Sequence, residues 1–536
     1  MKIAEFLLQT LELSGIRFIF GNPGTTEVPL VHACDGRRGI QYVVTLSEVS
    51  AVPMADGYAR ATRSLGVVNL HVAPGLGNGM GGLYTAGIAQ TPLLVLVGGQ
   101  DRRFLHTQPI LWGPVEKMAG TVAKAVFALD TRYDVVPNIR RALRTALTPP
   151  YGPVAVICPP DLLEQDIDES PAPVRPAELG GLSRESADEY ARLLRAAAAP
   201  AFIAAEDVHW NGAGDALERL AEYVAAPIYI APYTGAVPVS SRSPHYAGYL
   251  PPSLTQIAKR LAAHDVLFFV GGRGMRLTLY SEATLPQTKL WIGNNPDPIP
   301  VEGEFALAAV TDTRAGLTDI ATRLHADGSR RSMIAASLRP DPETPPEDPA
   351  VFHPSRAVRL LIEAFPDAIY VDESGISTSD VKQLIQVAAG EYLINGSGGI
   401  GWGLAASVGV ALGHPDRQVV ALIGDGSALY ASEALWTASH HGTKVLLIIL
   451  SNRRYATLNE AARRLVGRSL DLFTIEPPVI DFSGLATLYG WCYAKVGSEK
   501  ELGGFLAQTG DRVAENTLLE LTLDPAVGPV GSVHHF

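Results

Sequence analysis

One carboxylate between two glycines suggests a metal or phosphate site near residue 425. An apolar run, as expected for a buried strand, leads directly into Gly424, Asp425 and Gly426, and a second apolar run ends at Asn452. Because parallel strands joined by a right-handed crossover bring their carboxyl ends to one edge of a sheet, we expect Asp425 and Asn452 to be neighbours. One carboxylate and one amide oxygen suit a hard cation such as Mg²⁺. For the tripeptide alone, an ordinary turn in which Asp425 caps a helix is the alternative.

The same turn suits an anion that shares the cation. Gly424 and Gly426 carry no side chain, so a phosphate could approach the backbone there. The sequence then predicts one amphipathic helix that ends at Gly442, and a helix N-terminus attracts anions. We assign Ser427, in the first turn of that helix, to the same binding site.

Three further residues of the first 75 could act on protons or on a substrate. Glu48 lies at a predicted strand-to-helix junction, where stabilising the helix dipole is the simpler role. His71 follows an apolar run, and its ordinary pKa near neutrality suits proton transfer, although a buried histidine bonded to the backbone is the alternative. Thr25 follows Asn-Pro-Gly and could bind a substrate or simply form a turn.

The composition limits the class of protein that positions these groups. A chain of 536 residues is too long for one core and indicates about three domains. Its net charge of −12 and the absence of a dense run of lysine and arginine argue against binding to nucleic acid. Three scattered cysteines support neither a disulfide framework nor a zinc site. The N-terminus does not resemble a signal peptide and no apolar run reaches about 18 residues, so we expect a cytoplasmic protein without membrane spans.

The pattern of elements predicts an α/β fold with three doubly wound parallel-sheet domains. Short apolar, β-branched runs alternate with helical patterns along most of the chain, as in parallel sheets covered on both faces. Two segments rich in proline and acid, 166–186 and 325–355, read as linkers. We therefore predict domains at 1–170, 185–328 and 350–536. In both the first and the third domain, a strand ends in a turn that presents one acidic residue to a helix.

These motifs together resemble those of a known enzyme family. Gly-Asp-Gly at 424–426, followed after 25 residues by Asn452, resembles the cofactor signature of thiamine diphosphate (ThDP)-dependent enzymes. The three blocks match that family's pyrimidine-binding, central and diphosphate-binding domains. The resemblance implies that Mg²⁺ is bound by Asp425, Asn452 and the backbone carbonyl of Arg454. The family often has glycine after the asparagine, where this chain has Arg453.

The resemblance also assigns the residues around the rest of the cofactor. Glu48, followed by the segment Ala55 to Arg60, is similar to the family's catalytic glutamate, which activates the aminopyrimidine ring. Ile400 would press between the two cofactor rings, and the carbonyl of Gly398 would accept from the pyrimidine amine. Backbone groups of Gly375 and Ile376, or alternatively Ser377, would contact the diphosphate. In the family the glutamate reaches a cofactor held by another subunit, so we expect at least a homodimer and most often a homotetramer.

Within the family, the segments around Thr25 and His71 look closest to the benzoylformate decarboxylases. There the hydroxyl contacts the substrate carboxylate and the histidine moves protons. The resemblance implies decarboxylation of a bulky or aromatic 2-oxo acid to an aldehyde and CO₂. Two departures are Thr278, where those enzymes have a second histidine, and Ala461, where they have a phenylalanine. We hypothesise that His534 or His535 replaces the missing histidine.

Two other functions remain open. A carboligase like acetolactate synthase shares every step except the last, although we expect no FAD, because the flavin-contact pattern of those enzymes is only faintly present. A non-catalytic cofactor-binding protein is less consistent with a chain that has Glu48, Asp425 and Asn452 together.

Overall fold

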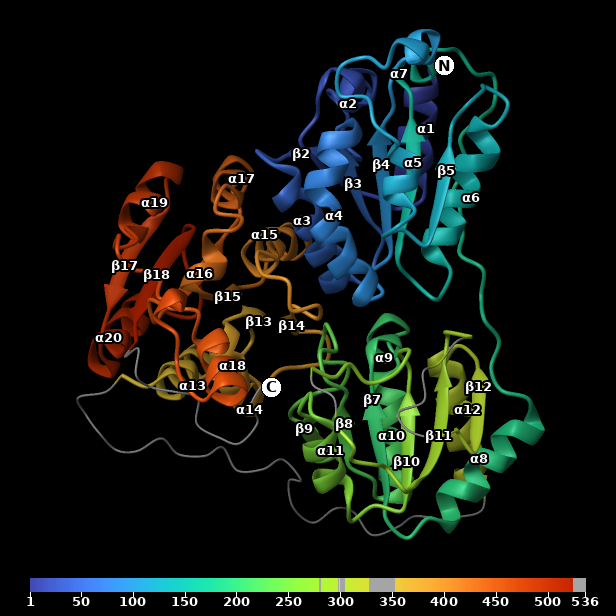
Figure 1. The fold of residues 1–536 in the computed structure, drawn as a ribbon. Helices are drawn as coiled ribbons and strands as arrows, with labels where there is room; N and C mark the ends of the chain where they lie inside the picture. The colour runs from blue at the N-terminus through green and yellow to red at the C-terminus, as the bar shows by residue number, and fades with distance from the viewer. Residues whose placement is uncertain (279–280, 297, 299–303, 327–351, 524–536) are drawn as a thin grey trace.

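The fold consists of three six-stranded parallel sheets, each covered by helices (Figure 1). The computed structural model describes residues 1–278, 281–296, 298, 304–326 and 352–523. This architecture confirms the predicted α/β class with three doubly wound parallel sheets. Among the described residues, no helix combines the length and the apolar character needed to cross a bilayer. The exact domain boundaries given above remain predictions.

The first sheet has the strand order β2-β1-β3-β4-β6-β5. β3 and β4 lie at its centre and are buried at every position, which explains their runs of valine and leucine. The strands are β1 (Phe18–Gly21), β2 (Gln41–Val44), β3 (Gly66–Leu70), β4 (Leu93–Gly98), β5 (Ala125–Ala128) and β6 (Pro153–Cys158). The helices are α1 (Ile3–Leu13), η1 (Thr25–Glu27), α2 (Val28–Cys34), α3 (Glu48–Thr62), α4 (Val72–Ile88), η2 (Arg102–Thr107), α5 (Val115–Ala119), α6 (Val135–Leu147) and α7 (Pro160–Leu163).

The third sheet repeats that order as β14-β13-β15-β16-β18-β17, which agrees with the shared plan expected for the first and third domains. Its strands are β13 (Ile369–Glu373), β14 (Tyr392–Ile394), β15 (Val419–Gly424), β16 (Val445–Ser451), β17 (Cys492–Val496) and β18 (Thr517–Thr522). Its helices are α13 (Pro354–Ala364), η3 (Gly375–Ser377), α14 (Thr378–Leu384), α15 (Gly403–Gly413), α16 (Asp425–Ala428), α17 (Ala434–His440), α18 (Ala456–Val466), η4 (Asp471–Phe473), α19 (Phe482–Tyr489) and α20 (Glu499–Thr509).

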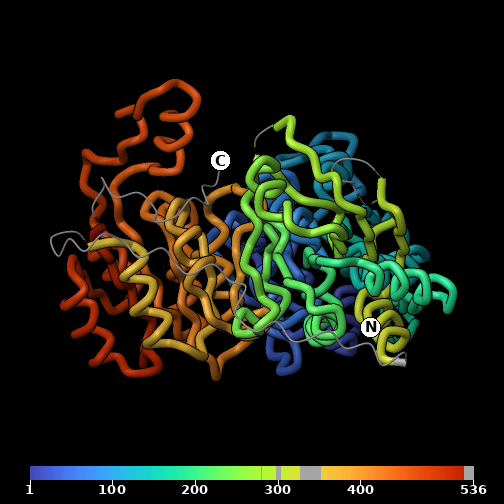
Figure 2. The backbone as a smooth tube through the Cα atoms, turned by 90° about the horizontal axis from the view of Figure 1, so that it is seen from below, coloured from blue at the N-terminus to red at the C-terminus, as the bar shows by residue number. Residues whose placement is uncertain are grey.

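The central sheet has a different order, β12-β11-β10-β7-β8-β9. Its strands are β7 (Pro200–Ala204), β8 (Ile228–Ile230), β9 (Tyr246–Tyr249), β10 (Val266–Val270), β11 (Thr288–Gly293) and β12 (Leu307–Val310). Its helices are α8 (Arg184–Ala196), α9 (Glu206–Trp210), α10 (Gly214–Val224), α11 (Leu254–Leu261) and α12 (Thr313–Ala326). In the tube view from below, the central domain lies in front of the first domain, and the third domain lies to their left (Figure 2).

Helices α3 and α15 join the first domain to the third with almost no space between their backbones. A Cβ added to Gly409 would lie 1.9 Å from the carbonyl oxygen of Met54, so only glycine fits there. Beside this contact, buried Arg60 pairs with Asp56 at 2.5 Å, and the indole of Trp402 donates to the same carboxylate at 2.6 Å. The buried charge is therefore compensated within the contact, as burial requires.

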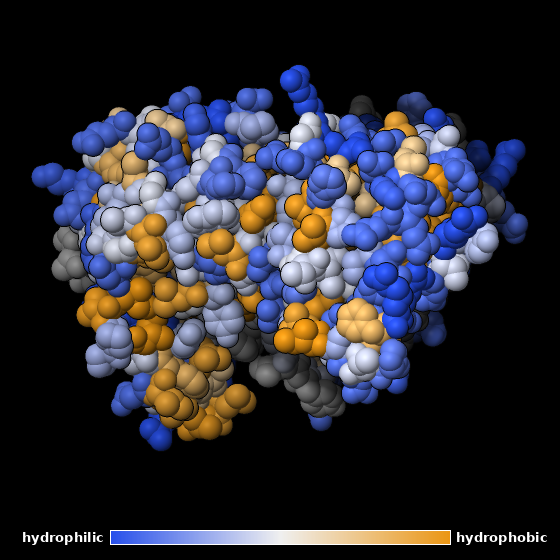
Figure 3. All heavy atoms as spheres, turned by 90° about the horizontal axis from the view of Figure 1, so that it is seen from above, coloured by the Kyte–Doolittle hydropathy of each residue, from blue (hydrophilic) through white to orange (hydrophobic). Residues whose placement is uncertain are grey.

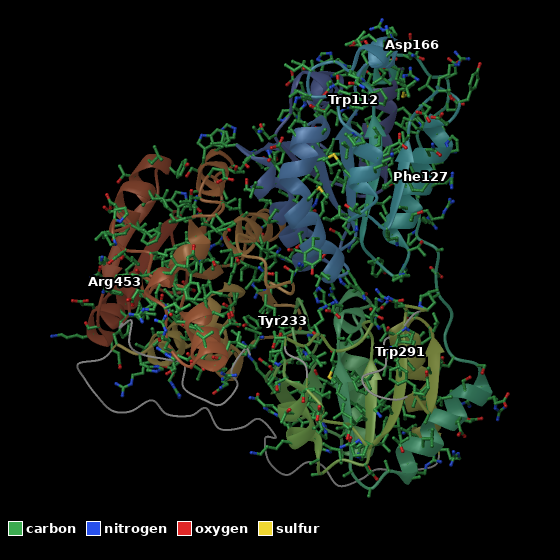
Figure 4. All side chains as sticks on the ribbon, viewed as in Figure 1. Trp112, Phe127, Asp166, Tyr233, Trp291 and Arg453 are labelled. Carbon is green, nitrogen blue, oxygen red and sulfur yellow. The ribbon has the colours of Figure 1, made fainter. Side chains whose placement is uncertain are left out.

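The central domain adds to an edge of the third sheet. Ala236 pairs antiparallel with Leu393 of β14, and Ile394 N donates to Gly235 O at 3.0 Å. Arg60 of the first domain donates to Ile394 O at 2.9 Å, so all three domains meet at this strand. Figure 4 labels Tyr233 at this junction.

The carboxyl edges of the first and third sheets point in opposite directions within one chain. Helices α2 and α7, which follow β1 and β6, lie at the top of Figure 1. Helices α14 and α18 follow strands β13 and β16 of the third sheet and lie toward its lower end (Figure 1). Groups at these two edges of a single chain therefore face away from each other.

A buried carboxyl in the central domain makes a prediction about stability. Asp207 is fully buried, its Oδ2 accepts from Asn294 N at 2.8 Å, and its Oδ1 has no hydrogen-bond partner among the described residues. Burial raises the pKa of Asp207 to about 7. The pKa of Asp207 is therefore higher in the folded protein than in the unfolded chain. The protonated carboxyl stabilises the fold at low pH, and this stabilisation is lost as the pH rises through about 7.

We therefore expect Asp207→Asn to melt at a higher temperature than wild type, with a difference that grows from pH 5 to pH 8 and reaches several degrees at the upper end. The reason is that the neutral amide cannot ionise in its buried position. Thermal unfolding across this range measures the effect, and Asp168→Asn, at an exposed carboxylate, is the control. A constant difference between variant and wild type at every pH would contradict the prediction.

Candidate active site

Asp425 is held at the carboxyl end of β15 by backbone N–H groups. It is 4% exposed, its Oδ1 accepts from Gly426 N at 2.8 Å, and its Oδ2 accepts from Arg453 N at 2.6 Å. Burial raises the pKa of Asp425 to about 6, and the hydrogen bonds from Arg453, Gly426 and Asn452 oppose that rise. Asp425 and the residues after β16 are therefore neighbours, as the right-handed crossover predicts.

The residues after β16 turn their backbones toward this carboxylate. Arg453 has φ +61°, a conformation that is uncommon for a residue with a side chain. Arg454 N donates to Asn452 Oδ1 at 3.2 Å, and Arg454 O accepts from Ala456 N at 3.0 Å. Asp425 and Asn452 thus lie together at this edge of the sheet. The role of the Arg454 carbonyl in metal binding stays a prediction.

The helix expected after this turn is broken in the structure. The single amphipathic helix predicted to end at Gly442 is two short helices, α16 and α17, although Gly442 does have the positive φ of a helix stop, at +62°. Leu429 and Tyr430 lie in the break and are exposed, and Tyr430 packs against Gly401. A four-residue helix has little dipole, so an anion at Gly424, Gly426 and Ser427 would depend on individual N–H and hydroxyl groups.

The remaining predicted cofactor residues surround the same edge. Gly398 has φ +79° and open space where a side chain would be, and Ile400 is 40% exposed. Gly375 has φ +63° and lies, with Ile376, in η3 after β13. The individual roles of these residues stay predictions.

Glu48 is the first residue of α3, at the corresponding edge of the first sheet. It is 7% exposed, and Asn78 of α4 donates to its Oε2 at 3.2 Å. A Cβ added to Gly75 would lie 2.6 Å from Glu48 Oε1 and 3.2 Å from His71 Cβ. The Glu48 carboxylate and the Cβ of His71 therefore both lie beside Gly75.

His71 is oriented by Glu27, which the sequence analysis did not identify. His71 Nδ1 lies 2.7 Å from Glu27 Oε2, and this carboxylate also accepts from Gly24 N at 2.8 Å and from the hydroxyl of Thr26 at 2.7 Å. Glu27 is 2% exposed. Thr26 contacts the imidazole nitrogen at 3.2 Å, whereas Thr25 is exposed on η1, so its assigned contact with substrate stays a prediction.

This pair leads to a test of His71. We expect Glu27→Gln to lower kcat about tenfold or more and to change the pH profile of kcat/KM, because the carboxylate holds one ring nitrogen and thereby directs the other toward the site. Thr26→Val, which removes one bond to Glu27, is the milder comparison. If Glu27→Gln folds and keeps both turnover and pH profile, Glu27 does not act through His71.

A pocket that has both apolar residues and the charged residues Arg102, Glu116, Lys117 and Asp130 in its lining begins next to His71 in the chain. The next residue, Val72, has φ +39°, a strained conformation for a β-branched side chain of the kind that is concentrated at functional sites. Val72 lines a cavity of about 350 Å³ together with Leu105, Leu111 and Trp112. Figure 4 shows Trp112 in the first domain, far from Arg453 in the third.

The residues present fit the expected cofactor and metal, although in two separate groups. Among the described residues no cluster of three or more histidine, cysteine or acidic side chains could hold a metal, so a cation here would use one carboxylate with neutral oxygens, as Mg²⁺ often does. The buried Asp425 carboxylate, with its raised pKa, would be stabilised by such a cation. Glu48 belongs to the other edge, with Asn78 and Gly75 as its neighbours.

Thr278 and Ala461, the two residues that depart from the family pattern, lie in different domains. Thr278 is tied to the backbone, since its N–H and its hydroxyl donate to Pro252 O at 3.0 and 3.1 Å. Ala461 lies in α18 and is half-buried. His534 and His535 lie outside the described residues, so the hypothesis about them is untested.

Family models match all three domains. The descriptions are thiamine pyrophosphate enzyme, N-terminal TPP binding domain, over residues 1–119; central domain, over residues 187–320; and C-terminal TPP binding domain, over residues 373–514. Together these ranges cover most of the chain.

Individual proteins resemble the chain along almost its whole length. Benzoylformate decarboxylase of Pseudomonas aeruginosa is 30% identical, over 96% of this chain and 98% of that protein. A solved thiamine diphosphate-dependent 4-hydroxybenzoylformate decarboxylase of Rhodococcus jostii superposes with a TM-score of 0.85 at 29% identity, over 98% and 99% of the two chains. A solved benzoylformate decarboxylase of Polynucleobacter necessarius has a TM-score of 0.91 at 25% identity, over 99% and 100%.

Proposed function

Since the chain belongs to the thiamine pyrophosphate enzyme family, we propose that it is a Mg²⁺-dependent decarboxylase of 2-oxo acids with bulky or aromatic side chains. The observation that supports this proposal is that the Glu48 carboxylate and the Cβ of His71 both lie next to Gly75. A carboxylate able to engage the cofactor and a histidine able to transfer a proton to product would then belong to one site.

Each residue has a distinct task in the proposed reaction. Thiamine diphosphate, when bound, supplies a nucleophilic carbon and accepts the electrons released as CO₂ leaves. Asp425 and Asn452 would hold Mg²⁺ and through it the diphosphate, and Ile400 would orient the rings. Glu48 would keep its carboxylate on the aminopyrimidine. His71, fixed through Nδ1 by Glu27, would present Nε2 to the reacting carbon and give it a proton.

The substrate class is supported by the pocket and by the relatives. The cavity of about 350 Å³ beside Val72 has apolar walls from Leu105, Leu111 and Trp112, which suit an aromatic or long aliphatic side chain. Its lining also has the charged residues Arg102, Glu116, Lys117 and Asp130. The relatives named above are decarboxylases of benzoylformate and 4-hydroxybenzoylformate. Both lines favour a 2-oxo acid larger than pyruvate.

A second copy of the chain would complete each site. The edge that carries Glu48 and the edge that carries Asp425 face in opposite directions, so one chain supplies half of two sites. Apolar side chains also gather on a projection of the third domain (Figure 3). In that domain, large exposed hydrophobic residues occur after β16, namely Leu458, Leu465, Val466, Leu472 and Val479. Such a surface favours burial against another subunit, and we propose a homodimer as the minimum active unit.

The function can be tested with purified protein, Mg²⁺, ThDP and a panel of 2-oxo acids. We expect CO₂ and the corresponding aldehyde from aromatic acids such as benzoylformate, at a higher kcat/KM than from pyruvate. If the main product is instead a 2-hydroxy ketone made from two carbonyl compounds, the chain is a carboligase. If no acid releases CO₂, the proposed decarboxylase is wrong.

A further inference from the structure

The loop that carries Ile400 is too rich in glycine to hold its own shape. Residues 395–401, called the Ile400 loop below, contain four glycines, and Gly398 and Gly401 have φ +79° and +102°. Glycine loses more conformational freedom on ordering than any other residue. The position of Ile400, which is 40% exposed, must therefore be fixed by contacts from outside the loop.

Glu373, the last residue of β13, provides the main contact. One carboxylate oxygen accepts from Gly401 N at 2.6 Å, and the other accepts from Gly403 N. Asn395 Nδ2 lies 3.4 Å from the first oxygen. Glu373 is 6% exposed, so these bonds are shielded from water.

Asn395 extends this anchoring along the loop. Its Oδ1 accepts from Ser397 N at 3.0 Å and from Ser397 Oγ at 3.1 Å, and its Nδ2 donates to Gly399 O. Ser397 Oγ in turn accepts from Gly399 N at 3.1 Å. The backbone on both sides of Ile400 is therefore connected to Glu373.

A simple helix cap would not account for this arrangement. Gly403 begins α15, and one acceptor at Gly403 N would satisfy that helix end. The bonds to Gly401 and Asn395 lie before the helix and act on the loop. Burial raises the pKa of Glu373 to about 7, and the hydrogen bonds from Gly403, Gly401 and Asn395 oppose that rise. A buried carboxyl of this kind is costly where only a cap is needed.

We propose that Glu373 is a positioning residue, which with Asn395 sets Ile400 against the bound cofactor. The inference rests on the proposed function and assigns no chemical step to Glu373. Its carboxylate fixes the two N–H groups that flank Trp402, and Asn395 fixes the backbone before Ile400. Loss of either anchor lets the glycines relax, so Ile400 no longer lies in one place when the cofactor binds.

The test is a double-mutant cycle between Glu373→Gln and Ile400→Ala, read by ThDP affinity in the presence of Mg²⁺ and by kcat. The amide presents an N–H₂ group to one of the two glycine N–H donors, so one bond is lost. We expect Glu373→Gln alone to weaken ThDP binding and to lower kcat about tenfold. In the Ile400→Ala background the same change should have less than about a twofold further effect, because the residue it positions is gone.

Two results would overturn the proposal. One is additivity, in which Glu373→Gln has the same effect in both backgrounds, as a purely structural role predicts. The other is wild-type affinity and turnover in Glu373→Gln. Should Glu373→Gln fail to fold, Asn395→Ala replaces it in the cycle with the same two criteria. Asp207→Asn, a buried carboxylate of the central domain, is the matched control and should leave ThDP affinity unchanged.

The failure of this inference can be distinguished from that of the proposed function. Wild-type protein that does not bind ThDP with Mg²⁺ would contradict the proposed function. Wild-type protein that binds ThDP normally, with an additive cycle, would contradict only the positioning role of Glu373.

Discussion

Glu48→Gln should lower kcat about a thousandfold and leave the folded structure intact. The carboxylate lies at the start of α3, where Asn78 donates to Oε2, and Oε1 is the oxygen that we expect to engage the cofactor. Glutamine has the same shape, but its amide cannot take up a proton as a carboxylate does. Steady-state turnover with an aromatic 2-oxo acid measures the loss.

The control for this variant is cofactor binding. The residues proposed to hold Mg²⁺ and the diphosphate lie on the other edge, so Glu48→Gln should still gain melting temperature when Mg²⁺ and ThDP are added. Asn78→Ala should give an intermediate loss of turnover. A Glu48→Gln protein with more than about a tenth of wild-type kcat would remove Glu48 from the catalytic residues.

Asp425→Asn should abolish the stabilisation of the protein by Mg²⁺ and ThDP. Ligand at about a hundred times its Kd stabilises a folded protein by about 2.7 kcal/mol, and we expect wild-type protein to show a shift of this order. The amide removes the one charged ligand that a hard cation would use at this edge. Thermal unfolding with and without Mg²⁺ and ThDP, and with EDTA, measures the difference. An unchanged shift in Asp425→Asn would place the metal elsewhere.

The two variants can be combined to test whether sites are shared between subunits. A dimer of one Glu48→Gln chain and one Asp425→Asn chain has both changes in one site and neither in the other. Co-expression with random pairing should therefore restore about a quarter of wild-type activity, since about half of the dimers are mixed and each has one intact site. Activity no higher than that of either variant alone would indicate that each site is built from a single chain.

The sequence identifies the parts of this fold that depend on local patterns. Buried parallel strands have the runs of valine, isoleucine and leucine seen in β4 and β16, so the three α/β sheets were predictable. The proximity of Asp425 and Asn452 followed from the handedness of crossovers alone. The break between α16 and α17 was not predictable, because Leu429 and Tyr430 continue the helical pattern while they are exposed on the surface.

The supporting carboxylates were missed for a physical reason. Glu27 reads as an acid in a first helical turn, and only the fold shows that Gly24 and Gly98 leave it space: a Cβ on Gly24 would lie 2.2 Å from the His71 ring, and one on Gly98 would lie 1.6 Å from Glu27 Oε1. Glu373 likewise ends a strand and precedes Gly375, so the sequence directs attention to the glycine. Contacts between distant segments decide both cases.

The antiparallel pairing of Ala236 with β14 has a consequence for solubility. A strand at the border of a sheet exposes a row of amide and carbonyl groups that can recruit another polypeptide into intermolecular β-structure. Here Gly235 and Val237 exchange hydrogen bonds with Ile394 and Tyr392 and occupy that row. The central domain thus protects the third domain from self-association. The third domain expressed by itself would expose this edge strand and would tend to aggregate.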